Sequence, residues 1–158
     1  MGDIYEEIKA DHDHHRKLID RIKDTSGASD DRRQAWDEFF HHVKSHAAAE
    51  EETFYSKLIS KTWGQDAARH SVAEHKELDD LMEELQGMDM GSSGWLNKFD
   101  TLAHDYLHHI DEEEEDLFKR AREVIPEDEI AGYGDRFRAR KEEEAKLVEE
   151  KRKDRLED

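Results

Sequence analysis

The sequence predicts an all-α protein, an antiparallel up-down bundle of four helices followed by a charged C-terminal extension. Three observations predict this class. The 158 residues include 8 glycines and a single proline, so few positions interrupt long segments. Hydrophobic residues make up 34% of the chain and recur at helical spacing, while charged residues make up 43%. No segment shows the alternating pattern of a β-strand.

The first two helices are expected at about residues 3 to 24 and 31 to 61. The turn TSGASDD separates them, and Ser29 or Asp30 can cap the second helix. Gly64 is expected to end the second helix. The hydrophobic residues expected on their buried sides are Ile4, Ile8, Leu18, Ile19, Ile22, Trp36, Phe39, Phe40, Val43, Phe54, Tyr55 and Leu58.

The third and fourth helices are expected at about residues 65 to 86 and 94 to 122. The stretch GMDMGSSG forms the loop between them, and Ser92 or Ser93 can cap the fourth helix. The hydrophobic residues of these two helices are Val72, Leu78, Leu81, Met82, Leu85, Trp95, Phe99, Leu102, Tyr106, Ile110, Leu117 and Phe118. Short loops between amphipathic helices favour an antiparallel bundle, because no single helix can bury its own apolar stripe.

Pro126 divides the chain into a bundle of residues 1–125 and a charged segment of residues 126–158. The charged segment contains so few apolar residues that we expect a solvated helix or a frayed tail rather than core.

The composition excludes several classes of function. A formal net charge of -18 argues against nucleic acids and anionic membranes as partners. The chain has no cysteine, which excludes disulfides, thiolate metal ligands and iron–sulfur clusters. It begins without the features of a signal peptide, and it has no run of about 20 apolar residues that could cross a bilayer. We therefore expect a cytoplasmic protein, and its oligomeric state is left open.

Sliding the sequence along itself by 63 residues aligns its two halves. The aligned polar pairs are His12 with His75, His46 with His109, Glu50 with Glu113, and Glu51 with Glu114. Each half thus has a histidine, a second histidine 34 positions later, and a glutamate four positions beyond that. Residues i and i+4 share one face of a helix, so each histidine–glutamate pair can bind one centre. In a bundle, all four helices can then direct ligands at a common point.

The repeat therefore predicts a metal centre with four imidazole and two carboxylate ligands. The predicted ligands are His12, His46, Glu50, His75, His109 and Glu113. Such a set suits two divalent or trivalent ions that the carboxylates can bridge. Mixed nitrogen and oxygen ligation fits iron best, with manganese or zinc as alternatives. Without a metal, these polar groups would be buried without partners, at a cost of roughly 1–3 kcal/mol each.

Other polar residues lie close to these ligands in the sequence. His15, His42 and Tyr106 each lie about one turn from a predicted ligand, and are candidates for an additional ligand or for contact with a bound molecule. Asp11 and Glu74 are candidates to support the ligands from outside. Each directly precedes a histidine, and so points about 100° away from it on the helix. Glu51 is a further candidate of this kind.

These motifs resemble the hemerythrin-like family, and specifically its HHE cation-binding domains. The family signature is a histidine, an HxxxE, a second histidine and a second HxxxE on four successive helices. Here these read DHDHH, HAAAE, EHKEL and HIDEE, and the likeness covers about residues 4 to 122. The resemblance implies an up-down four-helix bundle that holds a non-heme di-iron centre, bridged by the two glutamates and by an oxo or hydroxo group.

The family resemblance has one departure, on the third helix. In the oxygen-carrying hemerythrins the pattern has five histidines, and two of them lie four residues apart on the third helix. Here His70 and His75 are five apart, about 140° round the helix. The resemblance implies a protein that binds or senses dioxygen, nitric oxide or peroxide. Two alternatives are an enzyme that decomposes hydrogen peroxide and a protein that stores or donates iron.

Overall fold

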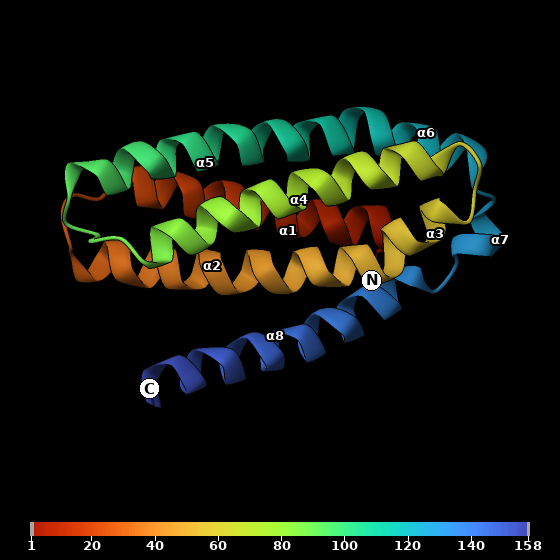
Figure 1. The fold of residues 1–158 in the computed structure, drawn as a ribbon. Coiled ribbons are helices and arrows are strands. Elements are labelled where there is room, and N and C mark those ends of the chain that lie inside the picture. Colours follow the sequence, from red (N-terminus) through yellow and green to blue (C-terminus); the bar gives the residue numbers. More distant parts are fainter. Residues whose placement is uncertain (1, 158) are drawn as a thin grey trace.

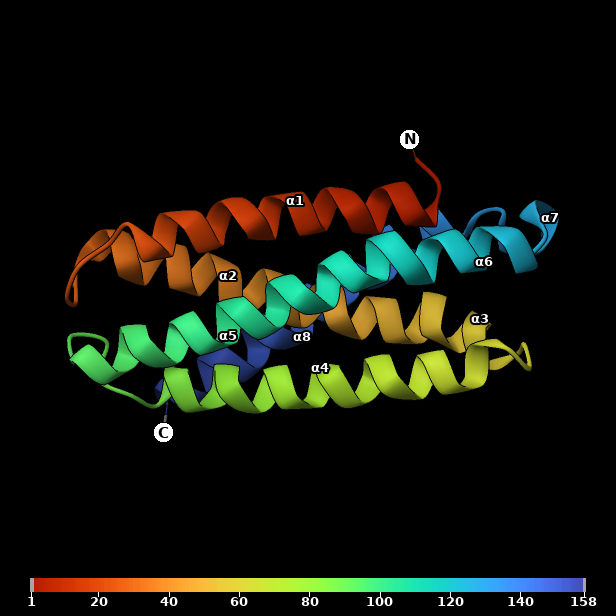
Figure 2. The same ribbon diagram turned by 90° about the horizontal axis from the view of Figure 1, so that it is seen from above.

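The computed structural model, which describes residues 2–157, confirms the all-α class. Four long helices form an antiparallel bundle in the order predicted (Figure 1). The α-helices are α1 (Ile4–Lys23), α2 (Asp30–Glu50), α3 (Ser56–Ile59), α4 (Gly64–Gln86), α5 (Ser93–Glu112), α6 (Phe118–Val124), α7 (Glu127–Ile130) and α8 (Tyr133–Glu157). Two π-helical segments, η1 (Glu51–Tyr55) and η2 (Glu113–Leu117), join α2 to α3 and α5 to α6. The view from above shows α1 beside α2 and α4 beside α5 (Figure 2).

Serine side chains cap the second and fourth long helices. The Ser29 hydroxyl accepts a hydrogen bond from the backbone N–H of Arg32, and the Ser92 hydroxyl accepts one from that of Trp95. These bonds satisfy backbone donors that a helix leaves without partners in its first turn. The sequence predicted Ser29 or Asp30 as one cap and Ser92 or Ser93 as the other. In each pair the first residue is the cap.

Gly64 begins α4, so the prediction that it ends the second helix is wrong. That helix ends at Ile59, and the chain turns back sharply. A Cβ atom on Gly64 would lie only 2.1 Å from the backbone oxygen of Leu58. The turn therefore needs a residue without a side chain, because the two helices approach one another at the backbone.

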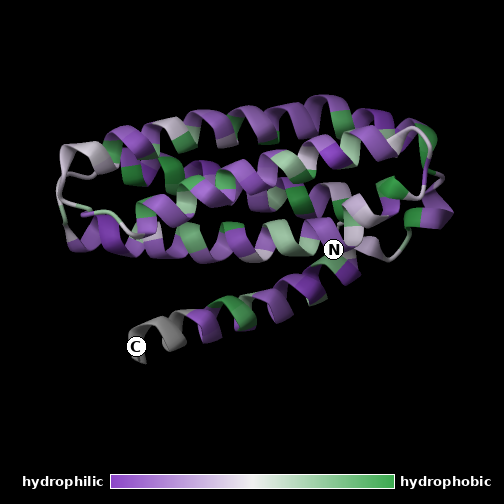
Figure 3. Ribbon diagram, viewed as in Figure 1, coloured by the Kyte–Doolittle hydropathy of each residue, from purple (hydrophilic) through white to green (hydrophobic). Residues whose placement is uncertain are grey.

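The apolar core forms two clusters with a polar layer between them. One cluster lies around Trp36, Phe39 and Trp95, and the other around Phe54 and Tyr55. Aromatic edge-to-face contacts join many of these rings, such as Trp36 with Trp95 at 5.4 Å between centroids. Outer faces of the helices are mostly hydrophilic (Figure 3). One predicted stripe residue lies outside the core, since Val72 is 40% exposed.

Each π-helical segment lies directly at a predicted ligand. The segment η1 follows Glu50, and η2 begins with Glu113, so the helix widens at positions of the two halves that differ by one residue in the repeat. Such segments are rare and are found mostly at functional sites. They shift the helix face by a fraction of a turn, and Phe54 and Phe118 still pack into the second cluster.

The charged C-terminal segment is not a solvated tail over its first half. Helix α8 runs along α2 on the outside of the bundle (Figure 1), and Glu149 still lies 3.8 Å from His41 of α2. Phe137 is 0% exposed and packs in the second apolar cluster. The sequence did not predict this packing, because Phe137 stands in a segment with many charged and few apolar residues. Within residues 2–157, no helix combines the length and apolar character needed to cross a membrane.

Candidate metal centre

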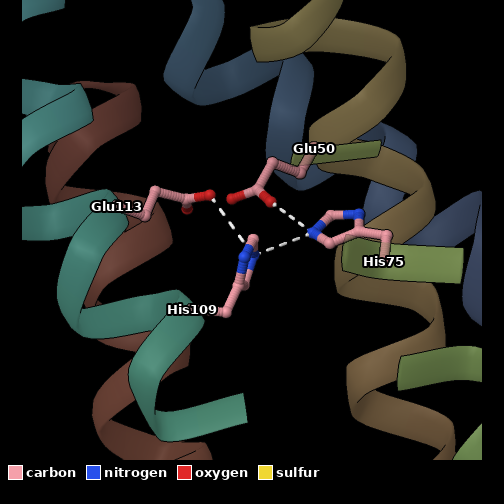
Figure 4. Close-up of side chains that lie close together, drawn as sticks. All are labelled: Glu50, His75, His109 and Glu113. Carbon is pink, nitrogen blue, oxygen red and sulfur yellow. Dashed lines mark hydrogen bonds and ion pairs between the residues drawn. The ribbon is translucent and has the colours of Figure 1, made fainter. Parts of the chain in front are cut away.

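Six side chains from the four long helices meet in the polar layer between the two apolar clusters. They are the six predicted ligands, His12, His46, Glu50, His75, His109 and Glu113. Five of them are buried, and the side chain of His75 is 8% exposed. They form two groups of closely spaced nitrogen and oxygen atoms, and the two groups share Glu50. Figure 4 shows the group that Glu50 forms with His75, His109 and Glu113.

All four histidines direct Nε2 towards the centre of this group. His46 and His109 place Nε2 at 3.5 and 3.6 Å from the glutamate one turn later on their own helix. His12 and His75 place Nε2 at 3.5 and 3.1 Å from the glutamate of the opposite half. Each glutamate therefore lies between histidines of two helices, which is the position of a group that can bridge two ions.

Several inward-facing atoms have no hydrogen-bond partner among the described residues. They are Nε2 of His46, both carboxylate oxygens of Glu50, and Oε1 of Glu113. A buried polar group without a partner costs about 1–3 kcal/mol, so this cluster is unfavourable unless something binds it. Ligand bonds of about 2.1 Å at right angles would place neighbouring ligand atoms about 3 Å apart, close to the separations found here. The residues fit a cation.

The outer nitrogen of each histidine faces a carboxylate. The Nδ1–carboxylate separations are 2.9 Å for His12 with Glu114, 2.7 Å for His46 with Asp11, 3.4 Å for His75 with Glu51 and 3.0 Å for His109 with Glu74. For His12, His46 and His109 the carboxylate accepts a hydrogen bond, so Nδ1 carries the proton and Nε2 presents its lone pair to the centre. This is the arrangement that holds histidine ligands in metal sites. Nδ1 of His75 faces Glu51 without a hydrogen bond.

Asp11 and Glu74 thus support histidines other than their sequence neighbours. Each points away from the adjacent histidine, as expected, and reaches the histidine of the neighbouring helix 35 residues later. The 63-residue repeat places both contacts in equivalent positions. The repeat also predicts the role of Glu114, since its equivalent Glu51 faces His75.

The pKa values of the two glutamates at the centre are shifted in opposite directions. Burial opposes charge on Glu50, but the imidazoles of His46 and His75, 3.5 and 3.1 Å away, hold the pKa of Glu50 well below its usual value. Burial and the negative charge of Glu50 raise the pKa of Glu113 well above its usual value. A cation that binds at the two glutamates therefore competes with protons for Glu113.

Basic residues neutralise the supporting carboxylates on one side of the centre. Lys141 of α8 lies 2.8 Å from Asp11, and Arg16 lies 2.7 Å from Glu114. Although burial opposes charge on Asp11, its hydrogen bonds with His46 and Lys141 lower its pKa to about 2. The helix outside the bundle therefore contacts the metal centre through one intervening carboxylate.

Tyr55 is a residue of the centre that the sequence reasoning assigned to the apolar core alone. Its hydroxyl donates a 2.5 Å hydrogen bond to Oε2 of Glu113 and lies 3.3 Å from Nε2 of His75. The equivalent residue in the other half is Phe118, which has no hydroxyl. This break in the repeat is the sequence signal that could have identified Tyr55.

His15, His42 and Tyr106 form a hydrogen-bonded chain beside the centre. The Tyr106 hydroxyl lies 2.6 Å from Nδ1 of His15, and Nε2 of His15 lies 2.6 Å from Nδ1 of His42. Both nitrogens of His15 are therefore engaged, and it does not direct a free nitrogen at the six predicted ligands. Burial and the nearby histidines hold the pKa of His15 well below its usual value, so its imidazole is neutral.

Comparison with known proteins identifies the family. The model of the hemerythrin HHE cation-binding domain matches residues 3–121, which is most of the chain. The protein belongs to the hemerythrin HHE family. The family is one of cation-binding domains, so this chain is a cation-binding protein. The inward-facing atoms that lack hydrogen-bond partners provide a place for the cation.

The hemerythrin HHE fold extends beyond the matched residues. A crystal structure of a hemerythrin HHE cation-binding domain-containing protein from Mycobacterium kansasii superimposes with a TM-score of 0.83 and 24% sequence identity. The alignment covers 96% of this chain and 92% of the other, which shows a common fold that includes most of α8. A search of curated proteins finds no match.

Proposed function

We propose that this HHE protein binds two iron ions between its six inward-facing ligands, and that it binds dioxygen, nitric oxide or peroxide at that pair. The observation that carries this proposal is the set of buried atoms without hydrogen-bond partners on His46, Glu50 and Glu113. Four nitrogens and two bridging carboxylates are a ligand set that suits iron, with manganese or zinc as alternatives. His12, His46, His75 and His109 would hold the ions together with Glu50 and Glu113.

A cavity gives small molecules a route to this centre. It has a volume of about 410 Å³, and all four predicted histidine ligands and Tyr106 contribute to its walls. Iron supplies reversible binding of a small oxygen or nitrogen ligand and a change of oxidation state. Val43, Met82 and Ile110 line the same cavity and limit the entry of water. The proposed partner is thus a diatomic molecule or peroxide, rather than nucleic acid or membrane.

Decomposition of hydrogen peroxide is the second candidate function, and the chain of Tyr106, His15 and His42 favours it. Conversion of two H₂O₂ to two H₂O and one O₂ consumes no net protons, but protons must move between oxygen atoms. His15 can accept a proton on one nitrogen while it releases the other, because both nitrogens are hydrogen-bonded. The His42 side chain is 28% exposed, so the chain reaches solvent.

One experiment separates the two candidates. The visible absorption spectrum of the iron-loaded protein should show an iron–ligand band that changes on addition of azide or peroxide. Oxygen release from peroxide is measured on the same samples. His15→Leu is the sharpest variant, because leucine stands at the equivalent position, Leu78, in the other half.

We expect His15→Leu to retain iron and the azide-dependent band. If it also loses oxygen release, peroxide decomposition is the function that uses the chain. Oxygen release at the wild-type rate would mean that the hydrogen-bonded chain of Tyr106, His15 and His42 takes no part in peroxide decomposition. Ligand binding would then remain the proposed function. The cytoplasmic location stays a prediction.

A further inference from the structure

Two cavities reach the centre, and their charges differ. The cavity of about 410 Å³ described above has Lys44, Lys76 and Lys151 among its lining residues, together with three acidic ones. A second cavity, of about 430 Å³, ends on His109 and Glu113. Its outer walls carry four further carboxylates, on Asp66, Glu74, Glu112 and Asp116, and Arg120 is the one lysine or arginine among its described lining residues. The second cavity therefore attracts cations.

A group of metal-binding side chains lies at the mouth of this second cavity. Nε2 of His70 is 3.3 Å from Oε1 of Glu74 and 3.9 Å from Oε1 of Glu112. One nitrogen and two oxygens, from α4 and α5, thus lie within 4.8 Å of one another. The other oxygen of Glu112 lies 3.4 Å from Nε2 of His108. Mixed nitrogen and oxygen ligands suit divalent first-row transition metals.

Glu74 connects this group to the buried centre. Its Oε1 atom, which faces His70, also accepts a 3.0 Å hydrogen bond from Nδ1 of His109. At the inner end of the cavity, Glu113 is 2% exposed and its Oε1 has no hydrogen-bond partner. Only the second cavity therefore separates a cation at its mouth from Glu113, whose Oε1 is buried without a partner.

The two halves of the repeat differ at this point. Asp11, the equivalent of Glu74, has its outer oxygen 2.8 Å from Lys141, and that side of the centre is covered by α8. Glu74 instead faces His70 and the second cavity. The protein thus supplies a positive charge to one supporting carboxylate and leaves the other open to a cation from solution.

We propose that His70, Glu74 and Glu112 capture divalent iron from solution and pass it through the second cavity to the buried centre. This inference rests on the proposed function, since it assumes that the centre holds iron. The ion moves as Fe²⁺ with no change of oxidation state.

The rate of iron uptake by the full-length, metal-free protein tests this proposal. Under anaerobic conditions, Fe²⁺ is added at a low concentration, and a chelator of ferrous iron stops the uptake at set times. The test variant is His70→Ala combined with Glu112→Gln, which leaves Glu74 in place beside His109. The matched control is His104→Ala combined with Asp105→Asn, an exposed pair on α5 outside the second cavity.

We expect the test variant to take up iron about tenfold more slowly, with the same final iron content, and the control to match the wild type. The difference should shrink as salt screens the acidic mouth. Uptake at the wild-type rate would overturn the capture site while leaving the buried centre in place. A lower final content would also overturn it, because the substituted residues would then act on the buried centre itself. A wild-type protein that takes up no iron would instead contradict the proposed function itself.

Discussion

The Asp11 carboxylate accepts a 2.7 Å hydrogen bond from Nδ1 of His46, although the two residues lie 35 positions apart on different helices. Its second oxygen lies 2.8 Å from the ammonium group of Lys141. A chain of three groups therefore joins α8 to a histidine that faces the proposed metal pair. This relationship gives the outer helix a direct means of positioning a ligand.

Lys141→Met should weaken metal binding about 10-fold to 100-fold, because Asp11 loses its fixed partner and holds His46 less firmly. The dissociation constant is measured by competition with a chelator. Arg138→Met is the control, since Arg138 lies on the same helix and pairs with Glu7 rather than with Asp11. Equal affinity in Lys141→Met and the control would show that α8 does not act on the ligand.

Tyr55→Phe should destabilise the metal-free protein by about 1–3 kcal/mol, because Glu113 loses a buried hydrogen-bond donor. It should also shift the visible absorption of the iron-loaded protein. Tyr5→Phe is a matched control, since the Tyr5 hydroxyl is buried without a hydrogen-bond partner. The free energy of unfolding is measured in urea. The same loss in both variants would contradict a special role for Tyr55.

The stability of the metal-free protein should depend on pH through His75. Burial opposes its charge, but the carboxylates of Glu50 and Glu51, 3.1 and 3.4 Å away, raise the pKa of His75 from 6.5 to about 9. The protonated imidazole thus stabilises the fold fully below pH 6.5, and this contribution of about 3 kcal/mol is lost as the pH rises through 9. Urea unfolding of wild type and His75→Gln between pH 6 and 10 measures it. Parallel curves for the two proteins would contradict this assignment.

Phe137→Ala should cost about 3–5 kcal/mol of stability, as expected for a fully buried aromatic side chain. Its ring also meets the edge of His46 at 5.4 Å between centroids, so metal affinity should fall as well. Leu147→Ala on the same helix, where the side chain is 45% exposed, should change stability little. Thermal unfolding of both variants checks the difference. An unaltered melting temperature in Phe137→Ala would mean that α8 is not docked in solution.

Local patterns predicted the bundle and the six inward-facing side chains. Helical spacing located the long helices, and the 63-residue repeat selected His12 over His14 and His15 without knowledge of the packing. The carboxylates behind the histidines depend on contacts between helices, so Asp11 could be placed beside His12 in sequence but not beside His46. The π-helical segments and the docking of Phe137 likewise depend on long-range packing that no local pattern encodes. Tyr55 could have been found from the absence of a hydroxyl at Phe118.

The iron content of the purified protein after aerobic loading tests the central claim most directly. We predict about two irons per chain in the wild type, and none in the variant His46→Ala combined with His109→Ala. The helical circular dichroism of the variant must remain at the wild-type level, so that the loss reports the site rather than unfolding. A wild type without bound iron, or a folded variant that still binds two ions, would contradict the proposed centre.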